Sequence, residues 1–444
     1  MRAKGYTDRI VTSERRKPTM LKLLPASAVL IAMCALIAAC SLSSQDPYPP
    51  FTELVKLTAS DALDDDEFGY AAAIDGNLAV VGAHYKDGAG SFRGAAYVFD
   101  RNRGGSDNWG QAAAITAADI DNGDRFGGAV DTCGNDVIIG AEGEDGAGTD
   151  RGAAYLFSRH TGGADSWGQM KKLTASDAGD GDAFGCATAL DGDTAVVGAY
   201  REGEAGPLAG AAYIFSRHQG GPDNWGEVCK LTGSDIDDDD YFGRSVAVSG
   251  DIVVVGAPLR TVTLMGDGAA YVFYRDQGGA DNWGQVAVLH AGDPDNWRAF
   301  GSTVAVSGDL ILIGAPGGEG AAYIFHRNQG GADNWGQVKK LTALDGEATD
   351  NFGGAAALAG ACAVIGASTE DGDGTGRGAV YAFSRNKGGP DNWGQVKKLT
   401  ASDTEDDDEF GTSVGVSADF IIAGSYGEDE AGQESGAAYI FSGE

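Results

Sequence analysis

Aspartate and glutamate are the only potentially reactive side chains that recur at regular intervals in this sequence. An acidic segment precedes each of seven Phe-Gly dipeptides, as in SDALDDDE at 60–67 and SDTEDDDE at 402–409. Oxygen ligands that alternate along a tight loop are typical of Ca²⁺ sites. Aspartate and glycine also form turns without any metal, so an acidic surface loop is the alternative. The best candidates for calcium ligands are Asp64, Asp66, Asp237, Asp239, Asp406 and Asp408.

Histidine and cysteine show no comparable pattern. A catalytic base needs convergent partners, and none is visible around the five histidines. Nucleophile-elbow, Walker and HExxH motifs are absent from the sequence. Four cysteines, Cys133, Cys186, Cys229 and Cys362, form no C-x-x-C pair, so zinc is unsupported and most are expected to fill small apolar spaces. We therefore expect a protein that is not an enzyme.

The acidic segments belong to a repeat that fills most of the chain. Phe-Gly begins at residues 68, 126, 184, 242, 300, 352 and 410, so the spacing is 58 residues except for one of 52. Each copy continues with a Gly-Ala pair, a GAAY-like segment, a loop that ends in DNWG and a segment such as QVKKLT. The six missing residues fall between Gly314 and Ala321, which predicts a shortened surface loop in the fifth copy.

Each copy predicts four short strands. DIVVVGAP at 251–258 is a nearly continuous β-branched run, as expected for a strand that is buried on both faces. GQVKKLT at 336–342 alternates apolar with charged residues, as expected for an outer strand with one wet face. Glycine and aspartate mark the turns between the strands. Seven copies of a four-stranded unit predict an all-β protein, a seven-bladed β-propeller.

The motifs resemble a known family. Phe-Gly, then Gly-Ala or Gly-Ala-Pro, then GAAY is similar to the FG-GAP repeats of integrin α-subunit heads, and more so to bacterial FG-GAP repeat proteins, over residues 51–444. The resemblance implies blades with the FG strand innermost, then the GA, GAAY and QVKKL strands. It also implies adhesion or ligand recognition. Integrin metal ligands lie between the FG and GA strands, where this chain has only a tight turn such as 249–251, so those ligands have no counterparts here.

The two ends of the repeat region are complementary. FTELVKLTASD at 51–61 matches WGQVKKLTASD at 393–403, while the last copy ends after its third strand, in GAAYIFSGE. We predict that residues 53–58 pair with residues 436–441. The N-terminal strand would then supply the missing outer strand of the last blade and complete 28 strands.

The N-terminal segment predicts export. Residues 20–39 combine a lysine, an apolar stretch and LIAA before Cys40, which resembles the lipobox of bacterial lipoproteins. We expect residues 1–39 to be a signal peptide, with Met20 as a possible true start, and residues 40–50 to form a tether lipidated at Cys40. Ser41 favours the outer membrane over inner-membrane retention. The alternatives are a soluble secreted protein and a retained helix.

The net charge and the repeats limit the classes of function that this protein can have. Removal of residues 1–39 leaves 25 Lys and Arg against 63 Asp and Glu, a net charge of −38, which excludes nucleic acid as a partner. We expect a monomeric, membrane-anchored binding or adhesion module that recognises a protein or glycan through loops on one face. A hydrolase or lyase with a site near the channel mouth, or an envelope scaffold, is the alternative. The shortened fifth copy and the unusual loop at 258–268 break the symmetry side by side, where a specific site is expected.

Overall fold

The computed structural model describes residues 51–163 and 165–443, which form 28 strands and no helix. The innermost strands are β2 (Phe68–Asp75), β6 (Ala129–Cys133), β10 (Ala187–Asp191), β14 (Ser245–Ser249), β18 (Thr303–Ser307), β22 (Ala355–Ala359) and β26 (Val414–Val416). The second strands are β3 (Leu78–Ala83), β7 (Asp136–Ala141), β11 (Thr194–Ala199), β15 (Ile252–Ala257), β19 (Leu310–Ala315), β23 (Cys362–Ala367) and β27 (Phe420–Ser425). The third strands are β4 (Ala95–Asp100), β8 (Ala153–Ser158), β12 (Ala211–Ser216), β16 (Ala269–Tyr274), β20 (Ala321–His326), β24 (Ala379–Ser384) and β28 (Ala437–Ser442). The outermost strands are β5 (Gly110–Ile115), β9 (Gly168–Leu173), β13 (Gly226–Leu231), β17 (Gly284–Leu289), β21 (Gly336–Leu341), β25 (Gly394–Leu399) and β1 (Thr52–Leu57).

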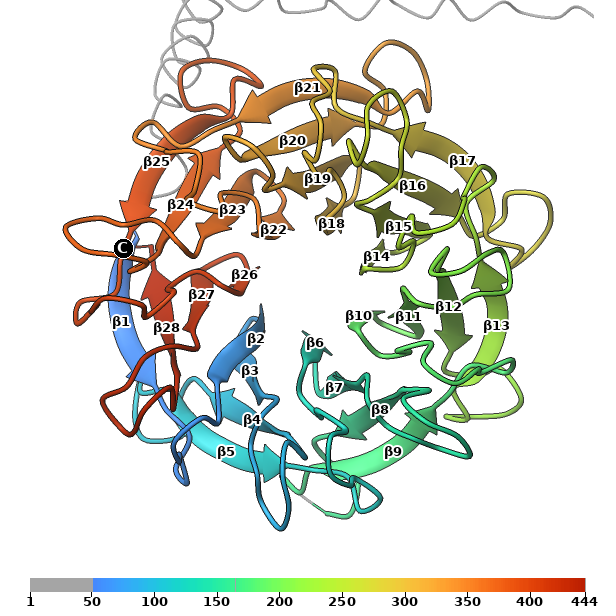
Figure 1. The fold of residues 1–444 in the computed structure, drawn as a ribbon. Coiled ribbons are helices and arrows are strands. Elements are labelled where there is room, and N and C mark those ends of the chain that lie inside the picture. Colours follow the sequence, from blue (N-terminus) through green and yellow to red (C-terminus); the bar gives the residue numbers. More distant parts are fainter. Residues whose placement is uncertain (1–50, 164, 444) are drawn as a thin grey trace, which may run out of the picture. The chain divides into compact units, whose positions relative to one another are not determined.

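The strands form seven antiparallel sheets, which stand as blades around a central channel (Figure 1). Blade 1 has the order β2-β3-β4-β5, and blades 2 to 6 repeat it along the chain. Innermost strands of adjacent blades contact one another around the whole ring. The predicted seven-bladed propeller is confirmed, with the strand order that the family resemblance implies.

Blade 7 is closed by the N-terminal strand. Its order is β1-β28-β27-β26, and β1 pairs antiparallel with β28, from Thr52 opposite Ser442 to Leu57 opposite Ala438. This confirms the predicted pairing of the two ends, with boundaries one residue from those expected. Phe51, which takes the place of the tryptophan in the other copies, is buried beside blade 6.

The core lies between the blades. Every residue of β3 is buried, because the second strand of each blade is covered on both faces by its neighbours. Phe126 of blade 2 packs at 5.5 Å from Tyr155 and 6.1 Å from Phe157, measured between ring centroids, and equivalent contacts recur in all seven blades. Trp109 meets Phe420 of blade 7 in the same way, at 5.3 Å. Aromatic side chains therefore fill the wedges between blades, as predicted.

Adjacent blades also approach at the level of the backbone. A Cβ atom added to Gly82 of β3 would collide with the carbonyl oxygen of Gly127, the glycine of the next Phe-Gly pair. Gly127 has a φ of +96°, a conformation that other residues rarely adopt, and donates a hydrogen bond of 2.9 Å to the Gly140 carbonyl oxygen. Both motif positions therefore require glycine.

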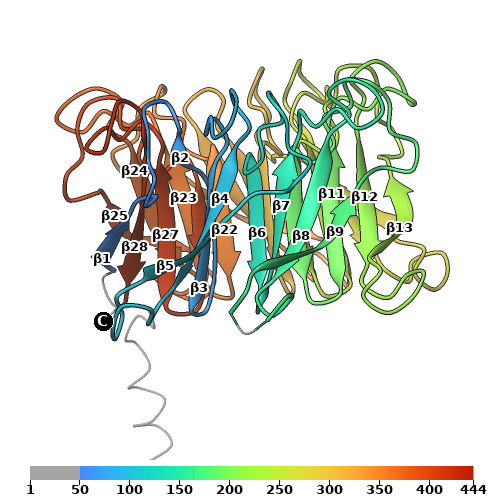
Figure 2. The ribbon, with the colours of Figure 1, turned by 90° about the horizontal axis from the view of Figure 1, so that it is seen from below.

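The strand directions define two faces of the propeller. The second-to-third-strand loops, such as 84–94, and the acidic connections between blades, such as 58–67, share what we call the upper face, at the top of Figure 2. The lower face carries the tight turns after the innermost strands and the start of β1, next to Ser442. Blade 5 keeps all four strands, and its β19–β20 connection is reduced to residues 316–320. The six-residue deletion thus lies in an upper-face loop, as predicted.

Deletion of residues 51–58 should destabilise the propeller by at least about 3 kcal/mol, since it removes the buried Phe51 and Leu57 side chains and exposes the edge of β28. Chemical denaturation would measure this loss. Leu54→Ser is the matched control, because Leu54 lies on the same strand and is 39% exposed. Equal stability of the deletion variant and the wild type would contradict closure by β1.

Candidate functional site

The acidic connections fold as self-contained turns. Asp66, only 1% exposed, accepts a hydrogen bond of 2.7 Å from the backbone N–H of Leu63, three residues earlier. The same bond recurs in six of the seven connections, and its acceptors are Asp66, Asp124, Asp182, Asp240, Asp350 and Asp408. In blade 5 the equivalent residue is Arg298. The last aspartate of each connection is therefore a turn-forming residue.

The six predicted calcium ligands do not converge. Asp66 and Asp408 are buried turn formers, and Asp66 also pairs with Lys86 at 2.7 Å. Asp406 faces Arg377 at 2.9 Å on the surface. The remaining three, Asp64, Asp237 and Asp239, are exposed.

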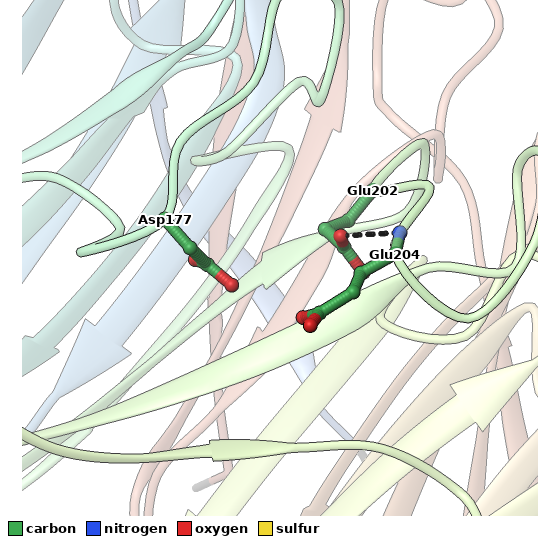
Figure 3. A group of neighbouring side chains, drawn as sticks. All are labelled: Asp177, Glu202 and Glu204. Carbon is green, nitrogen blue, oxygen red and sulfur yellow. Dashed lines mark hydrogen bonds between the residues drawn. The ribbon is translucent and has the colours of Figure 1, made fainter.

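The structure brings a different set of carboxylates together. Two groups of three in the described residues have oxygens within 4.8 Å of one another, and neither includes any of the six aspartates. One group is Asp177, Glu202 and Glu204 (Figure 3), and the other is Asp403, Glu428 and Glu430. In each, the aspartate comes from the acidic connection and both glutamates from the second-to-third-strand loop.

A lysine ammonium lies within each group. Lys230 Nζ is 2.7 Å from Asp177, 3.3 Å from Glu202 and 2.7 Å from Glu204. Lys56 of β1 lies 2.7 Å from all three carboxylates of its group. The ammonium groups occupy the position that a bound cation would take.

The ion pairs hold these groups in their charged forms. Burial alone would lower the pKa of Lys230, but hydrogen bonds to Asp177 and Glu204 raise it well above its ordinary value. Burial alone would raise the pKa of Asp177, but hydrogen bonds from Lys230 and Tyr213 hold it below its ordinary value. Lysine and aspartate are therefore both charged at neutral pH.

Every blade has a version of this arrangement. The first aspartate of the connection accepts the hydroxyl of the third-strand tyrosine, as in Tyr213 to Asp177 at 2.8 Å, in five blades. A cation lies beside this aspartate in all seven. Five blades supply it from the outermost strand, through Lys56, Lys172, Lys230, Lys340 and Lys398.

In the other two blades, the cation comes from the second-to-third-strand loop instead of the outermost strand. Ala114 and Val288 replace the lysine in blades 1 and 4. There Lys86 lies 3.8 Å from Asp61, and Arg260 lies 3.3 Å from Asp235. Both cations stand four residues after the Gly-Ala glycine, where blades 2, 3, 6 and 7 have glutamate. This exchange keeps one cation beside each aspartate. We call each such aspartate with its cation a lysine staple, and we propose that these ion pairs are structural crosslinks rather than calcium sites.

The channel itself offers little chemistry. A cavity of about 250 Å³ is lined by small and apolar residues of the innermost strands, and Asp131 is the only titratable group among them. Burial raises the pKa of Asp131 to about 7, although its carboxylate accepts hydrogen bonds from the backbone N–H groups of Leu190 and Thr132 at 2.7 and 2.8 Å. In this lining, Thr188 contributes a hydroxyl, and no second carboxylate accompanies Asp131.

The upper mouth of the channel is aromatic on one side. Tyr70 and His84 lie 3.7 Å apart between ring centroids, followed by Tyr85 at 3.9 Å from His84 and Phe92 at 4.9 Å from Tyr85. Tyr426 of blade 7 lies 6.1 Å from Tyr70. We call these five residues the mouth cluster. Tyr70 is 38% exposed and Phe92 47%, so the cluster presents aromatic surface to a ligand.

Glu67 and His84 are the titratable pair of this cluster. His84 Nδ1 lies 3.5 Å from Glu67 Oε2. Burial raises the pKa of Glu67 to about 7, and neighbouring carboxylates add to this rise. Burial and the nearby Arg125 lower the pKa of His84 to about 3, so the imidazole is neutral at physiological pH. The sequence does not indicate this site, because Tyr70 lies on a different strand segment from His84 and Tyr85 and meets them only in the fold.

The four cysteines in the described part of the chain are not gathered into a metal-binding group. Cys133, Cys186 and Cys229 are free thiols, and Cys362 is buried. Cys186 precedes the innermost strand of blade 3 and Cys229 lies on the outermost strand of that blade. Burial raises the pKa of Cys186 to about 12 and of Cys229 to about 11, which suppresses thiolate chemistry.

Comparisons with known proteins agree with this architecture. FG-GAP repeats match at residues 51–99, 109–157, 167–215, 225–273, 283–325, 335–383 and 393–441. The chain belongs to the FG-GAP repeat family. Each match starts on an outermost strand and ends on the third strand of the next blade, so the FG-GAP sequence repeat is offset from the blade. FG-GAP propellers commonly serve as ligand-binding or adhesion modules.

Other comparisons add only structural similarity. A search of curated proteins returns no match. Among solved structures, the computationally designed protein Ika8 is similar at a TM-score of 0.48 and 14% identity, over 88% of this FG-GAP chain and 99% of the designed chain. No helix in the described part of the FG-GAP chain is long and apolar enough to cross a membrane.

Lys230→Met should lower the free energy of unfolding by about 2 kcal/mol at pH 7, because Glu202 loses its ammonium partner in a buried position. The depressed pKa of Asp177 contributes stability above about pH 4, so the difference from the wild type should shrink below that pH. Denaturant unfolding at pH 7 and pH 3 would measure both. Lys171→Met, on β9, is the control, since the Lys171 ammonium donates a hydrogen bond to the neutral amide oxygen of Asn224.

The Lys230→Met variant also tests whether these carboxylates bind a lysine or a calcium ion. Wild-type thermal melts should superimpose in Ca²⁺ and in EDTA, because the Lys230 ammonium already occupies the space between the three carboxylates. The Lys230→Met variant, with three carboxylates left together, should melt at a higher temperature in Ca²⁺ than in EDTA. Stabilisation of the wild type by Ca²⁺ would instead support calcium in the acidic loops.

Proposed function

We propose that this FG-GAP propeller is a non-enzymatic binding module that recognises a protein or glycan ligand through its upper face. The mouth cluster carries this proposal. Its aromatic rings supply a large contact area with polar tips, which is the composition of binding hot spots. Arg125, 6.0 Å from the Tyr85 ring, and Glu67 add charged groups at its edge. The ligand would rest over blades 7 and 1, where the mouth is aromatic.

The other positions around the mouth that are equivalent to Tyr70 differ from it in chemistry. The residues equivalent to Tyr70 in blades 5, 6 and 7 are Ser302, Gly354 and Thr412, and all four line the upper mouth. Arg244 occupies the position in blade 4. A ring with unlike sides can orient an asymmetric ligand, which supports specific recognition rather than general adhesiveness.

The strand directions support an orientation at a membrane. We propose that Cys40 is lipidated at the cell envelope, on the outer membrane, after cleavage of residues 1–39; residues 1–50 lie outside the described part of the chain. Residues 40–50 would form the tether between the lipid and the propeller. Because β1 starts on the lower face, such a tether holds that face toward the lipid and leaves the upper face free for a ligand. A secreted form would present the same surface.

An enzyme is the second candidate, and the raised pKa of Glu67 favours it. A carboxyl group with a pKa of about 7 suits a general acid at a channel mouth. His84 is a weak partner, since its lowered pKa leaves the imidazole neutral and the residue is buried against the rings of Tyr70 and Tyr85. Turnover in a hydrolase or lyase panel that Glu67→Gln abolishes would replace the binding proposal.

Tyr70→Gly combined with Phe92→Ser should reduce ligand capture at least tenfold while leaving the fold intact, because both side chains are exposed and blades 2 and 6 already carry glycine at the Tyr70 position. A glycan array and pull-down from envelope extracts would supply the ligand. Leu344→Ser is the matched control, since Leu344 is 86% exposed on blade 6 and lies outside the mouth cluster. Undiminished capture by the double variant would remove the mouth cluster from the proposal.

Cys40→Ser should move the protein from the membrane fraction to the soluble fraction and abolish incorporation of labelled fatty acid, because the thiol is the acceptor of the lipid. Fractionation of cells that express each form would measure this. Cys133→Ser serves as the control for loss of a thiol. Equal membrane association of the two variants would refute the anchor without touching the ligand-binding surface.

A further inference from the structure

A second exposed surface lies where blades 4 and 5 meet on the upper face. Val262, Leu264 and Met265 of the β15–β16 loop are 39%, 37% and 60% exposed, and Trp297 of the next acidic connection is 57% exposed. We call these four residues the blade 4–5 patch. It coincides with the region where the sequence predicts broken symmetry. The other six tryptophans end the DNW-type loops, and five of them are buried.

Trp297 is held in an unfavourable backbone conformation. Its φ is +55°, in the left-handed region, where bulky side chains are rare. Five of the six equivalent residues are suited to it, namely Asp65, Gly123, Gly181, Asp239 and Asp407, with φ between 64° and 87°; the sixth is Thr349. Trp225, Trp283, Trp335 and Trp393 also have a positive φ, but they are buried. Trp297 differs from them in its exposure, which points to a use at the surface.

The surrounding loop positions the Trp297 ring. A Cβ atom on Gly266 would lie 2.7 Å from the Trp297 ring, so the indole packs directly against the Gly266 backbone. The backbone N–H of Trp297 donates a hydrogen bond of 2.8 Å to the Met265 carbonyl oxygen. The buried Asp267 carboxylate accepts the backbone N–H groups of Val262, Thr263 and Leu264 at 2.8 to 3.0 Å. The apolar surface is therefore built in advance rather than formed by a loose loop.

The rim of the patch is acidic. Asp235 and Asp237 flank it from blade 4 and are 51% and 82% exposed at the side chain, while Asp295 flanks it from blade 5 at 62%. Arg260 pairs with the blade 4 aspartates, and Arg298 lies 3.6 Å from Asp295; both arginines are largely covered, while the aspartates stay exposed. An apolar centre with an acidic rim is complementary to an apolar group among basic residues.

We propose that the blade 4–5 patch docks a protein segment that presents an apolar side chain flanked by lysine or arginine. The apolar side chain packs on Trp297 and Met265, and the basic groups face Asp237 and Asp295. A second copy of this chain would bring two acidic rims together, and an anionic lipid surface would meet the same repulsion. This interface is separate from the mouth cluster and does not depend on it.

A phage-displayed library of random 12-residue peptides is the probe, panned against the purified full-length protein. Enriched peptides should carry an aromatic or aliphatic residue next to lysine or arginine. Their affinity should fall at least tenfold for Trp297→Gly and for Met265→Ser, and at least threefold for Asp237→Asn with Asp295→Asn. Raising NaCl from 50 to 500 mM should weaken binding as well. Leu344→Ser, an exposed leucine on blade 6, is the control and should bind within twofold of the wild type.

Stability measurements distinguish docking from a structural role. Trp297→Gly should melt within about 2 °C of the wild type, because it removes an exposed ring and relieves the strained conformation. Met265→Ser keeps the test valid if Trp297→Gly fails to fold. Peptides that lack basic residues, peptides that bind both variants as tightly as the wild type, or no enrichment would each overturn the proposal. A dimer in light scattering that Met265→Ser abolishes would overturn it in favour of self-association.

Discussion

The propeller depends on backbone contact between adjacent blades at paired glycines. The glycine of each Gly-Ala pair lies against the carbonyl oxygen of the glycine in the next Phe-Gly pair, where no side chain fits. This contact joins all seven blades, including the last to the first. The pairs are Gly82–Gly127, Gly140–Gly185, Gly198–Gly243, Gly256–Gly301, Gly314–Gly353, Gly366–Gly411 and Gly424–Gly69. The two most regular motifs of the sequence thus mark one interaction, seen from its two sides.

Close backbone approach also explains the way in which the ring closes. Blade 7 reaches blade 1 through Gly424 and Gly69, and the Phe68 N–H donates to the Ser435 carbonyl oxygen at 3.1 Å. Strand β1 then joins β28 at the periphery, with Lys56 bound to three carboxylates of blade 7. The first strand therefore belongs to the last blade both through its backbone and through the same lysine staple that the other blades form internally.

Repetition determined what could be predicted from the sequence. The strands, the shortened loop of blade 5 and the closure, predicted for residues 53–58 and found at 52–57, follow from comparing copies. The order of the strands within a blade came from the family resemblance. The carboxylates illustrate the limit. Alternating aspartates suggested Asp64 and Asp66 as one site, but the fold turns Asp66 inward onto Leu63 and Lys86. The lysines that neutralise the actual groups lie on strands far from them in sequence, such as Lys56 beside Asp403, so no local pattern indicates them.

Positions that differ from blade to blade are the candidates for ligand binding in this repeat. Positions that recur are occupied by the glycine contacts, the interblade aromatics and the lysine staples, and each has a structural role that seven copies share. Ligand recognition needs groups that differ from blade to blade, because seven equal sites on a ring would not distinguish orientation. Tyr70 at the mouth and Trp297 at the rim are such departures, and both expose aromatic surface on the upper face. Trp297 is the sharper case, since the four other tryptophans with a positive φ are buried, whereas Trp297 is exposed. An exposed aromatic ring at a position that the other copies fill with aspartate, glycine or threonine points to binding rather than to folding.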